Sequence, residues 1–216
     1  MFHSFIRGLL STIFPKDTHM QHIESLSVED FCAQVKESNL SHAYIHARFS
    51  YKDKMVQKTI HALKYRGNTL VASLLAHTLF ELIIAELSEP IIGEVQKRPL
   101  IIPIPLSKKR FRMRGFNQAE LLINQFKKYD TEHTFSYPTT ILRKIKHTES
   151  QTKMRSRQER LKNNRGCFRV TRPDVVQGNI VLIIDDVTTT GATFTEAYRV
   201  VKEAGAENVL CFAVAH

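Results

Sequence analysis

The chain has 216 residues, which is enough for one α/β domain with a sizeable core and a modest appendage. Apolar residues make up 43% and charged residues 24% of the sequence, which is typical of a globular domain and excludes disorder throughout. The net charge of +10, from 31 Lys and Arg against 21 Asp and Glu, favours polyanionic partners such as nucleotides, pyrophosphate or nucleic acid, without choosing among them.

The cysteine content and the apolar runs bear on where the protein works. Cys32, Cys167 and Cys211 are odd in number and unpaired in spacing, which excludes a disulfide framework and a C-x-x-C metal site. No run approaches the roughly 18 apolar residues of a membrane span, and no apolar signal segment with a small-residue cleavage site opens the sequence. We therefore expect a cytoplasmic protein without a membrane span.

Residues 1–43 are expected to form an N-terminal helical segment. Apolar residues recur at helical spacing over residues 2–14, directly before a proline, which predicts a short amphipathic helix. This helix either packs on its own domain or contacts a partner or a membrane surface. His19 and His22 have the spacing of half a zinc site, but no second pair of ligands follows at suitable spacing, so no zinc is predicted.

A strand and two helices are predicted next. Residues 44–51 are rich in aromatic residues, which favours a strand. The apolar face that follows indicates a helix that ends at Gly67, with Lys64 and Arg66 in its last turn, where cations complement the helix dipole. A second helix is expected over about residues 70–87.

A basic run follows the next predicted strand. Residues 100–106 form a buried-type strand that two prolines terminate. Five cations then fall within seven residues: Lys108, Lys109, Arg110, Arg112 and Arg114. Such a run is usually a solvated face, yet this one stands at the carboxyl end of a strand, where open α/β sheets bind ligands. Asn117 is expected to begin the next helix.

Residues 143–165 form a second basic region. They contain nine cations against two acids, with polar residues in the middle and no strong apolar stripe. This composition predicts a mobile loop, at about residues 145–165, that leads into a basic helix. Closure over an anionic ligand and contact with nucleic acid both suit such a charge run, and the two roles are not exclusive.

The most informative stretch begins with the apolar run at residues 180–184, which predicts a strand buried on both faces. Two adjacent acids, a threonine-rich turn and a helix over residues 194–204 follow, and residues 209–214 supply a final buried strand. Amide groups at the first turn of a helix have no intrahelical partner and attract phosphate, and Gly191 lets the backbone approach an anion closely. The acids need another role, either accepting hydrogen bonds from a sugar diol or helping to hold a divalent cation.

This combination predicts a site for a phosphorylated sugar, formed by Asp185, Asp186, Val187, Thr188, Thr189, Thr190, Gly191, Ala192 and Thr193. A P-loop ATPase is excluded, because the chain has no G-x-x-x-x-G-K-[ST] loop.

The stretch from Ile183 to Thr193 reads I-I-D-D-V-T-T-T-G-A-T and resembles the fingerprint of the type I phosphoribosyltransferases. The K-Y-R-G segment at residues 64–67, P-I-P-L at 103–106 and R-G-F-N-Q-A at 114–119 further resemble the ComF family, which is associated with natural competence. The resemblance implies an α/β fold with a mostly parallel sheet flanked by helices, here over residues 44–216. Unlike many ComF proteins, this chain has no N-terminal cysteine pairs.

The resemblance also implies site roles. The acids would hold the ribose hydroxyls of phosphoribosyl pyrophosphate (PRPP), the turn would hold its 5′-phosphate, and Mg²⁺ would arrive with PRPP rather than in a protein cage. The loop Leu106, Ser107, Lys108 and Lys109 would take the pyrophosphate. The lid residues would be Thr148, Gln151, Arg155 and Arg160.

Two functions stay open. In the first, the protein is a phosphoribosyltransferase acting on an unidentified acceptor. In the second, it is a PRPP-sensing competence protein that binds single-stranded DNA, with a competence helicase as a candidate partner. The candidate nucleic-acid contacts are Lys64, Arg66, Arg110, Arg112 and Arg114.

Overall fold

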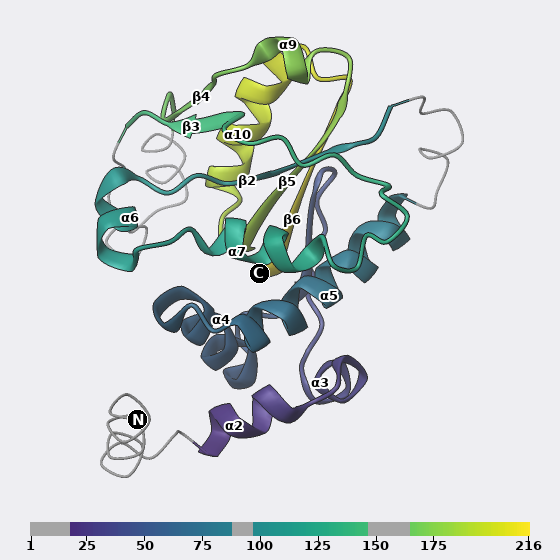
Figure 1. The fold of residues 1–216 in the computed structure, drawn as a ribbon, viewed down its shortest axis with the longest axis vertical. Coiled ribbons are helices and arrows are strands. Elements are labelled where there is room, and N and C mark those ends of the chain that lie inside the picture. Colours follow the sequence, from purple (N-terminus) through teal and green to yellow (C-terminus); the bar gives the residue numbers. More distant parts are fainter. Residues whose placement is uncertain (1–17, 88–96, 147–164) are drawn as a thin grey trace, which may run out of the picture.

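The computed structural model describes residues 18–87, 97–146 and 165–216, so the helix predicted at residues 2–14 lies outside it (Figure 1). Its centre is a four-stranded parallel sheet in the order β1-β6-β5-β2. The predicted α/β class with a mostly parallel sheet is confirmed. The strands are β1 (Ile45–Phe49), β2 (Leu100–Pro103), β5 (Ile180–Val187) and β6 (Asn208–Ala215).

Helices cover both faces of this sheet. α5 (Thr69–Leu87) and α7 (Gln118–Phe126) pack against one face, and α10 (Ala192–Glu203) packs against the other, as Figure 1 shows. α10 connects β5 to β6, which are neighbours and parallel, so residues 180–215 form the βαβ unit that the sequence predicts. This unit places the turn between β5 and α10 at the carboxyl edge of the sheet.

Alternation along β5 explains why both faces are apolar. Leu182 and Ile184 join the hydrophobic cluster under α5 and α7, while Val181 and Ile183 join the cluster under α10. Successive side chains of a strand point to opposite faces, and here each face meets a helix layer. The continuous apolar run in the sequence is therefore a central strand of a covered parallel sheet.

Three N-terminal helices extend the α5 layer. α2 (Thr18–Ser25), α3 (Val28–Gln34) and α4 (Lys54–Arg66) lie together below α5 in Figure 1. Ile23 of α2 and Phe31 of α3 are fully buried in the same cluster that lines the underside of the sheet. The described part of the N-terminal segment therefore shares the core of the main domain.

The first basic run forms a short helix, α6 (Lys108–Arg114), which the sequence analysis did not predict. Ser107 caps its start, because the Ser107 hydroxyl accepts a hydrogen bond from the Arg110 amide at 3.4 Å. Gly115 ends it in the left-handed conformation with φ of 78°, and its N–H donates to the Phe111 carbonyl at 2.7 Å. α9 (Pro173–Val176) is a second short helix, before β5.

A small antiparallel pair, β3 (Leu142–Lys144) and β4 (Phe168–Val170), stands apart from the main sheet. β3 includes the first two residues of the second basic region, Arg143 and Lys144, because pairing with β4 gives them a partner that local composition does not reveal. The rest of that loop, residues 147–164 with Thr148, Gln151, Arg155 and Arg160, lies outside the described residues.

α5 is the one described helix that is long and apolar enough to cross a membrane by length and composition alone. The expectation of no membrane span stays a prediction, because the core helix of a globular domain meets the same criterion. Nine of its 19 residues are buried, and it packs against α4, α7 and the sheet. A helix that packs against neighbours on several sides, at the centre of a domain, is apolar around much of its circumference.

Candidate functional site

The two acids stand at the carboxyl end of β5 and point to different sides of the sheet. Asp185 follows the face of Val181 and Ile183, and Asp186 follows the opposite face, toward the α4 and α5 layer. Both carboxylates are buried, Asp186 with only 3% of its surface exposed. The Asp186 amide donates to Asp185 Oδ1 at 2.8 Å, which fixes the first carboxylate against the backbone.

Lys64 is the cation that compensates the second acid. It comes from the last turn of α4, and its Nζ lies 3.0 Å from Asp186 Oδ2. Burial by itself would lower the pKa of the Lys64 ammonium, but the charge of Asp186 and, at longer range, that of Asp185 outweigh burial and raise this pKa. Lys64 is therefore charged at neutral pH and is directed inward, toward the acids.

Asp185 has a different electrostatic environment from Asp186. Burial raises the pKa of the Asp185 carboxyl, the neighbouring Asp186 charge raises it further, and the Asp186 amide and Lys64 oppose this shift only in part. Two adjacent buried acids thus share one nearby ammonium. Such an arrangement favours a ligand that brings hydroxyl donors, or cations of its own, to the acids.

The turn after β5 has donors that no other described residue accepts from. Gly191 adopts the left-handed conformation with φ of 75° and stands directly before α10. Across the described ranges, Thr190 Oγ1 is buried without a hydrogen-bond partner, and the amides of Gly191 and Ala192 have no backbone acceptor. A phosphate would satisfy these groups. The Thr188 amide is different, because it donates to the Ala215 carbonyl at 3.0 Å, so at Thr188 only the hydroxyl could serve a ligand, as the sequence analysis proposes.

The end of β2 lies beside the end of β5. Pro103 is in register with Ile184, and the Ile104 amide donates to the Ile184 carbonyl at 2.8 Å, one residue before the acids. The loop that follows leads into Ser107, whose side chain is buried, and then into the exposed Lys108 and Lys109 of α6. The structure thus brings the predicted pyrophosphate loop next to the acidic pair.

Asn117 ties this loop to α7. Its Oδ1 accepts from the Ala119 amide at 3.1 Å and caps the helix, while its Nδ2 donates to the Ile104 carbonyl at 3.0 Å. Asn117 is buried, with 3% exposed. One side chain therefore both begins α7, as predicted, and fixes the backbone at the start of the loop.

The K-Y-R-G and R-G-F-N-Q-A segments, far apart in sequence, meet in space. The Arg114 guanidinium lies over the Tyr65 ring at 5.3 Å from its centroid and donates to Gln118 Oε1 at 2.8 Å. A Cβ added to Gly67 would lie 3.2 Å from Cε1 of Phe116, so a larger residue would press on the Phe116 ring. The contact fixes the end of α4, from which Lys64 reaches the acids.

Lys144, at the end of β3, was missed as a neighbour of the site. Its ammonium lies 5.3 Å from the centroid of the Phe168 ring. Burial and the charge of Arg110 lower the pKa of Lys144, and Cys167 and Asp185 oppose this shift. Lys144 is thus close enough to Asp185 to interact with it electrostatically. Lys144 reaches the site because β3 pairs with β4, and a strand of three residues is too short to be predicted from its sequence pattern.

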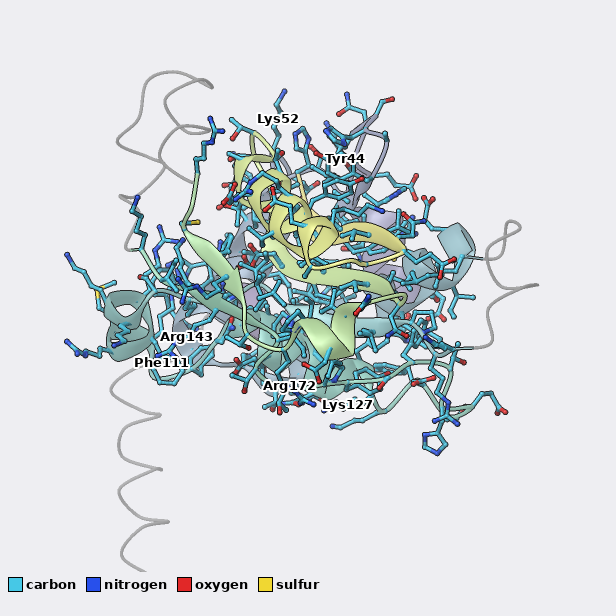
Figure 2. The ribbon with its side chains drawn as sticks, turned by 90° about the horizontal axis from the view of Figure 1, so that it is seen from above. Tyr44, Lys52, Phe111, Lys127, Arg143 and Arg172 are labelled. Carbon is cyan, nitrogen blue, oxygen red and sulfur yellow. The ribbon has the colours of Figure 1, made fainter. Side chains whose placement is uncertain are left out.

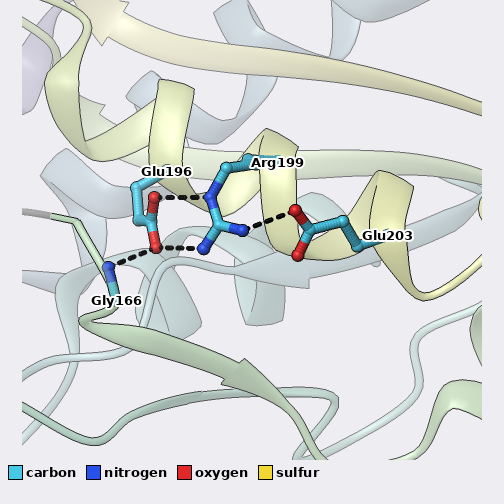
Figure 3. Close-up of polar contacts among 4 residues, drawn as sticks. All are labelled: Gly166, Glu196, Arg199 and Glu203. Carbon is cyan, nitrogen blue, oxygen red and sulfur yellow. Dashed lines mark hydrogen bonds and ion pairs between the residues drawn. The ribbon is translucent and has the colours of Figure 1, made fainter.

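The far side of α10 has a polar brace, shown in Figure 3. Glu196 accepts from the Gly166 amide at 2.7 Å and from two nitrogens of Arg199, at 2.7 Å and 2.9 Å. Arg199 also contacts Glu203 at 2.5 Å. The brace therefore fixes the segment just before β4 to α10, the helix that begins at the turn after β5.

The candidate nucleic-acid contacts do not form one uniform surface. Lys64 points inward, Arg66 and Arg112 are exposed, and Arg110 and Arg114 are half-buried. Phe111 and Met113 on α6 are also exposed, at 48% and 71% of their surfaces. In Figure 2, Phe111 lies on the outer edge of the molecule. α6 therefore presents cations and apolar side chains together.

The donor set bears on which cation the site would take. Among residues 18–87, 97–146 and 165–216, no group of three or more His, Cys, Asp and Glu side chains is placed to hold a metal ion. The acidic pair consists of hard oxygen donors, but Lys64 already contacts one of them. These residues fit the hydroxyls of a ligand that arrives with its own Mg²⁺ better than a metal site built from protein alone.

Comparisons with known proteins agree with this geometry. The phosphoribosyl transferase domain family matches residues 71–216. The chain is 31% identical over 150 residues to the DNA utilization protein YhgH of Escherichia coli O157:H7, covering 69% of this chain and 62% of that protein. It is 30% identical over 157 residues to the competence protein ComFC of Bacillus subtilis, covering 73% and 57%. Competence protein F of Haemophilus influenzae is 31% identical over 117 residues, covering 53% and 49%.

The matched region spans about half to three fifths of the length of these curated relatives. The family match covers more than half of this chain, and it includes the acidic pair, the turn and the loop after β2. The R-G-F-N-Q-A segment and the K-Y-R-G segment pack together beside that site. The chain therefore belongs to the ComF family, within the type I phosphoribosyltransferase superfamily.

Proposed function

We propose that the protein binds PRPP together with Mg²⁺ at the carboxyl edge of the sheet and transfers its phosphoribosyl group to an acceptor that is not yet identified. The main support is one juxtaposition. Two buried acids at the end of β5 adjoin a turn in which Thr190 Oγ1 has no partner among the described residues and Gly191 exposes the start of α10. A ribose phosphate has both a diol for the acids and an anion for the turn.

In this proposal each segment has one task. Asp185 and Asp186 accept hydrogen bonds from the ribose hydroxyls and orient the sugar, and the turn at residues 189–193 fixes the 5′-phosphate. Ser107, Lys108 and Lys109 bind the pyrophosphate. Mg²⁺ supplies charge neutralisation on the diphosphate when it is bound.

The reaction breaks the bond between carbon 1 of the ribose and the pyrophosphate oxygen, and pyrophosphate leaves with the electron pair. The acceptor then forms a new bond to carbon 1 and loses its proton. Positive charge develops on the sugar ring and negative charge on the leaving group. The protein's contribution is to hold the ring near the carboxylates and the leaving group near the cations of α6, where these charges are stabilised.

Calorimetry with PRPP and MgCl₂ tests the binding step. We expect the wild type to bind and the double variant Asp185→Asn/Asp186→Asn to lose binding with an unchanged circular dichroism spectrum, because amides are weaker acceptors for the diol. Retained binding in the double variant would remove the assigned roles. Pyrophosphate release across a panel of bases and amines then separates a transferase from a protein that only binds PRPP.

A second function, binding of single-stranded DNA with PRPP as an effector, is supported by the surface of α6. Exposed Phe111 and Met113 stand among cations, an arrangement suited to base stacking beside phosphate contacts. The relatives named for DNA utilization and competence agree with this alternative. Anisotropy of a labelled oligonucleotide should show affinity that falls steeply with salt. Phe111→Ser should weaken it, whereas Leu70→Ser, at an even more exposed apolar site on α5, should not. Binding that is undetectable or independent of salt rejects this function.

A further inference from the structure

Lys64 differs from the other cations of the K-Y-R-G and α6 segments. It is only 20% exposed, and its Nζ lies 3.0 Å from Asp186 Oδ2. A lysine that only complements the dipole of α4 would extend into solvent. The side chain of Lys64 instead crosses from the helix layer to the end of β5.

The end of α4 is held so that this crossing is fixed. Gly67 caps the helix with φ of 58°, against the Phe116 ring. Tyr65, next to Lys64, lies under the Arg114 guanidinium. Contacts made by two of the three residues that follow Lys64 therefore fix the position from which its side chain extends.

The acids need a cation at this place. Asp185 and Asp186 are adjacent and both buried, and charges of like sign at this separation disfavour one another. Lys144 acts on the Asp185 side, from β3. Lys64 alone, among the described residues, forms an ion pair with Asp186.

We propose that Lys64 is a positioning residue of the ligand site: its ammonium pairs with the Asp186 carboxylate and fixes the position of that carboxylate at the end of β5, so that the acidic pair can bind a sugar diol. This inference rests on the proposed function, because its effect is measured as affinity for PRPP. It assigns Lys64 a role inside the sugar site and removes it from the surface that contacts nucleic acid.

The test compares variants that differ in charge at one position. Calorimetry with PRPP and MgCl₂ is carried out on the full chain for the wild type, Lys64→Gln, Lys64→Arg and Lys58→Gln. Lys58 is an exposed lysine on the same helix, so its variant controls for net charge. We expect Lys64→Gln to lose at least about tenfold in affinity, Lys64→Arg to stay within about threefold of the wild type, and Lys58→Gln to be unchanged.

A chemical rescue provides a readout that a purely structural role would not change. In Lys64→Ala, added propylammonium should restore part of the lost affinity, while the same concentration of sodium chloride should not. This measurement also decides the matter if Lys64→Gln does not fold.

Wild-type affinity in Lys64→Gln would overturn the inference. An equal loss in Lys64→Gln and Lys64→Arg, or no rescue by the amine, would also overturn it. A wild type that does not bind PRPP at all is a distinct result, because it overturns the proposed function and removes the inference with it.

Discussion

Asn117 makes two buried hydrogen bonds that are separable in energy, and replacing it tests how the loop after β2 is held. In Asn117→Ala, α7 loses its cap on the Ala119 amide, which costs about 1 kcal/mol. The Ile104 carbonyl loses its partner in a buried environment, which costs a further ~1–3 kcal/mol. The expected total is about 2–4 kcal/mol of unfolding free energy. Affinity for PRPP should also fall, because Ile104 begins the loop that leads to the site.

Urea unfolding followed by circular dichroism measures this loss, with the slope unchanged if only the native state is affected. Ser27→Ala is a matched control, because Ser27 caps the exposed start of α3 with one bond to the Asp30 amide at 3.0 Å and makes no second backbone bond across the fold. It should cost about 1 kcal/mol or less. Asn117→Ser should recover only the capping part. If Asn117→Ala costs no more than Ser27→Ala, the bond to the Ile104 carbonyl contributes nothing and the reasoning is refuted.

Three further predictions concern the site and its support. Gly191→Ala should lower the unfolding free energy by ~1–3 kcal/mol and weaken PRPP binding, because φ is 75° and the new methyl would lie 3.1 Å from a β1 side chain. Gly166→Ala is the control, because φ is 71° there but the space is open, and it should cost less in the same urea assay. Glu196→Gln should lower the unfolding free energy by about 1–2 kcal/mol, because this buried carboxylate accepts three hydrogen bonds. Glu203→Gln, at the exposed end of the brace, should stay within about 0.5 kcal/mol of the wild type. Equal effects would contradict the role of Glu196 as the centre of the brace. Burial and the adjoining acid raise the pKa of Asp185 to about 8, above its value of 3.8 in an exposed chain. The contribution of Asp185 to stability is therefore full below about pH 4 and is lost as pH rises toward 8. In Asp185→Asn the melting temperature should change less with pH across this window and should exceed that of the wild type at its upper end, and an unchanged slope would refute this sign.

The local patterns of the sequence determined the elements of the site. The apolar run before Asp185 could only be satisfied by a strand covered on both faces, and two acids beside a Thr/Gly turn have few stable uses without a sugar or an anion. The glycine at the end of α4 and the asparagine before α7 acted where they were predicted, since both effects depend on the nearest few residues.

Only the tertiary structure decided what these elements face. Lys64 was predicted as a surface contact, and Lys144 was placed in a basic loop, yet one pairs with Asp186 and the other lies within electrostatic reach of Asp185. The Thr188 amide bonds to the neighbouring strand β6, a partner that the sequence of the turn does not reveal. The sequence pattern predicts the secondary structure and the helix caps, because these depend on neighbours in sequence. The partner of a long charged side chain depends on which segments the sheet brings together, and that follows from packing across more than a hundred residues.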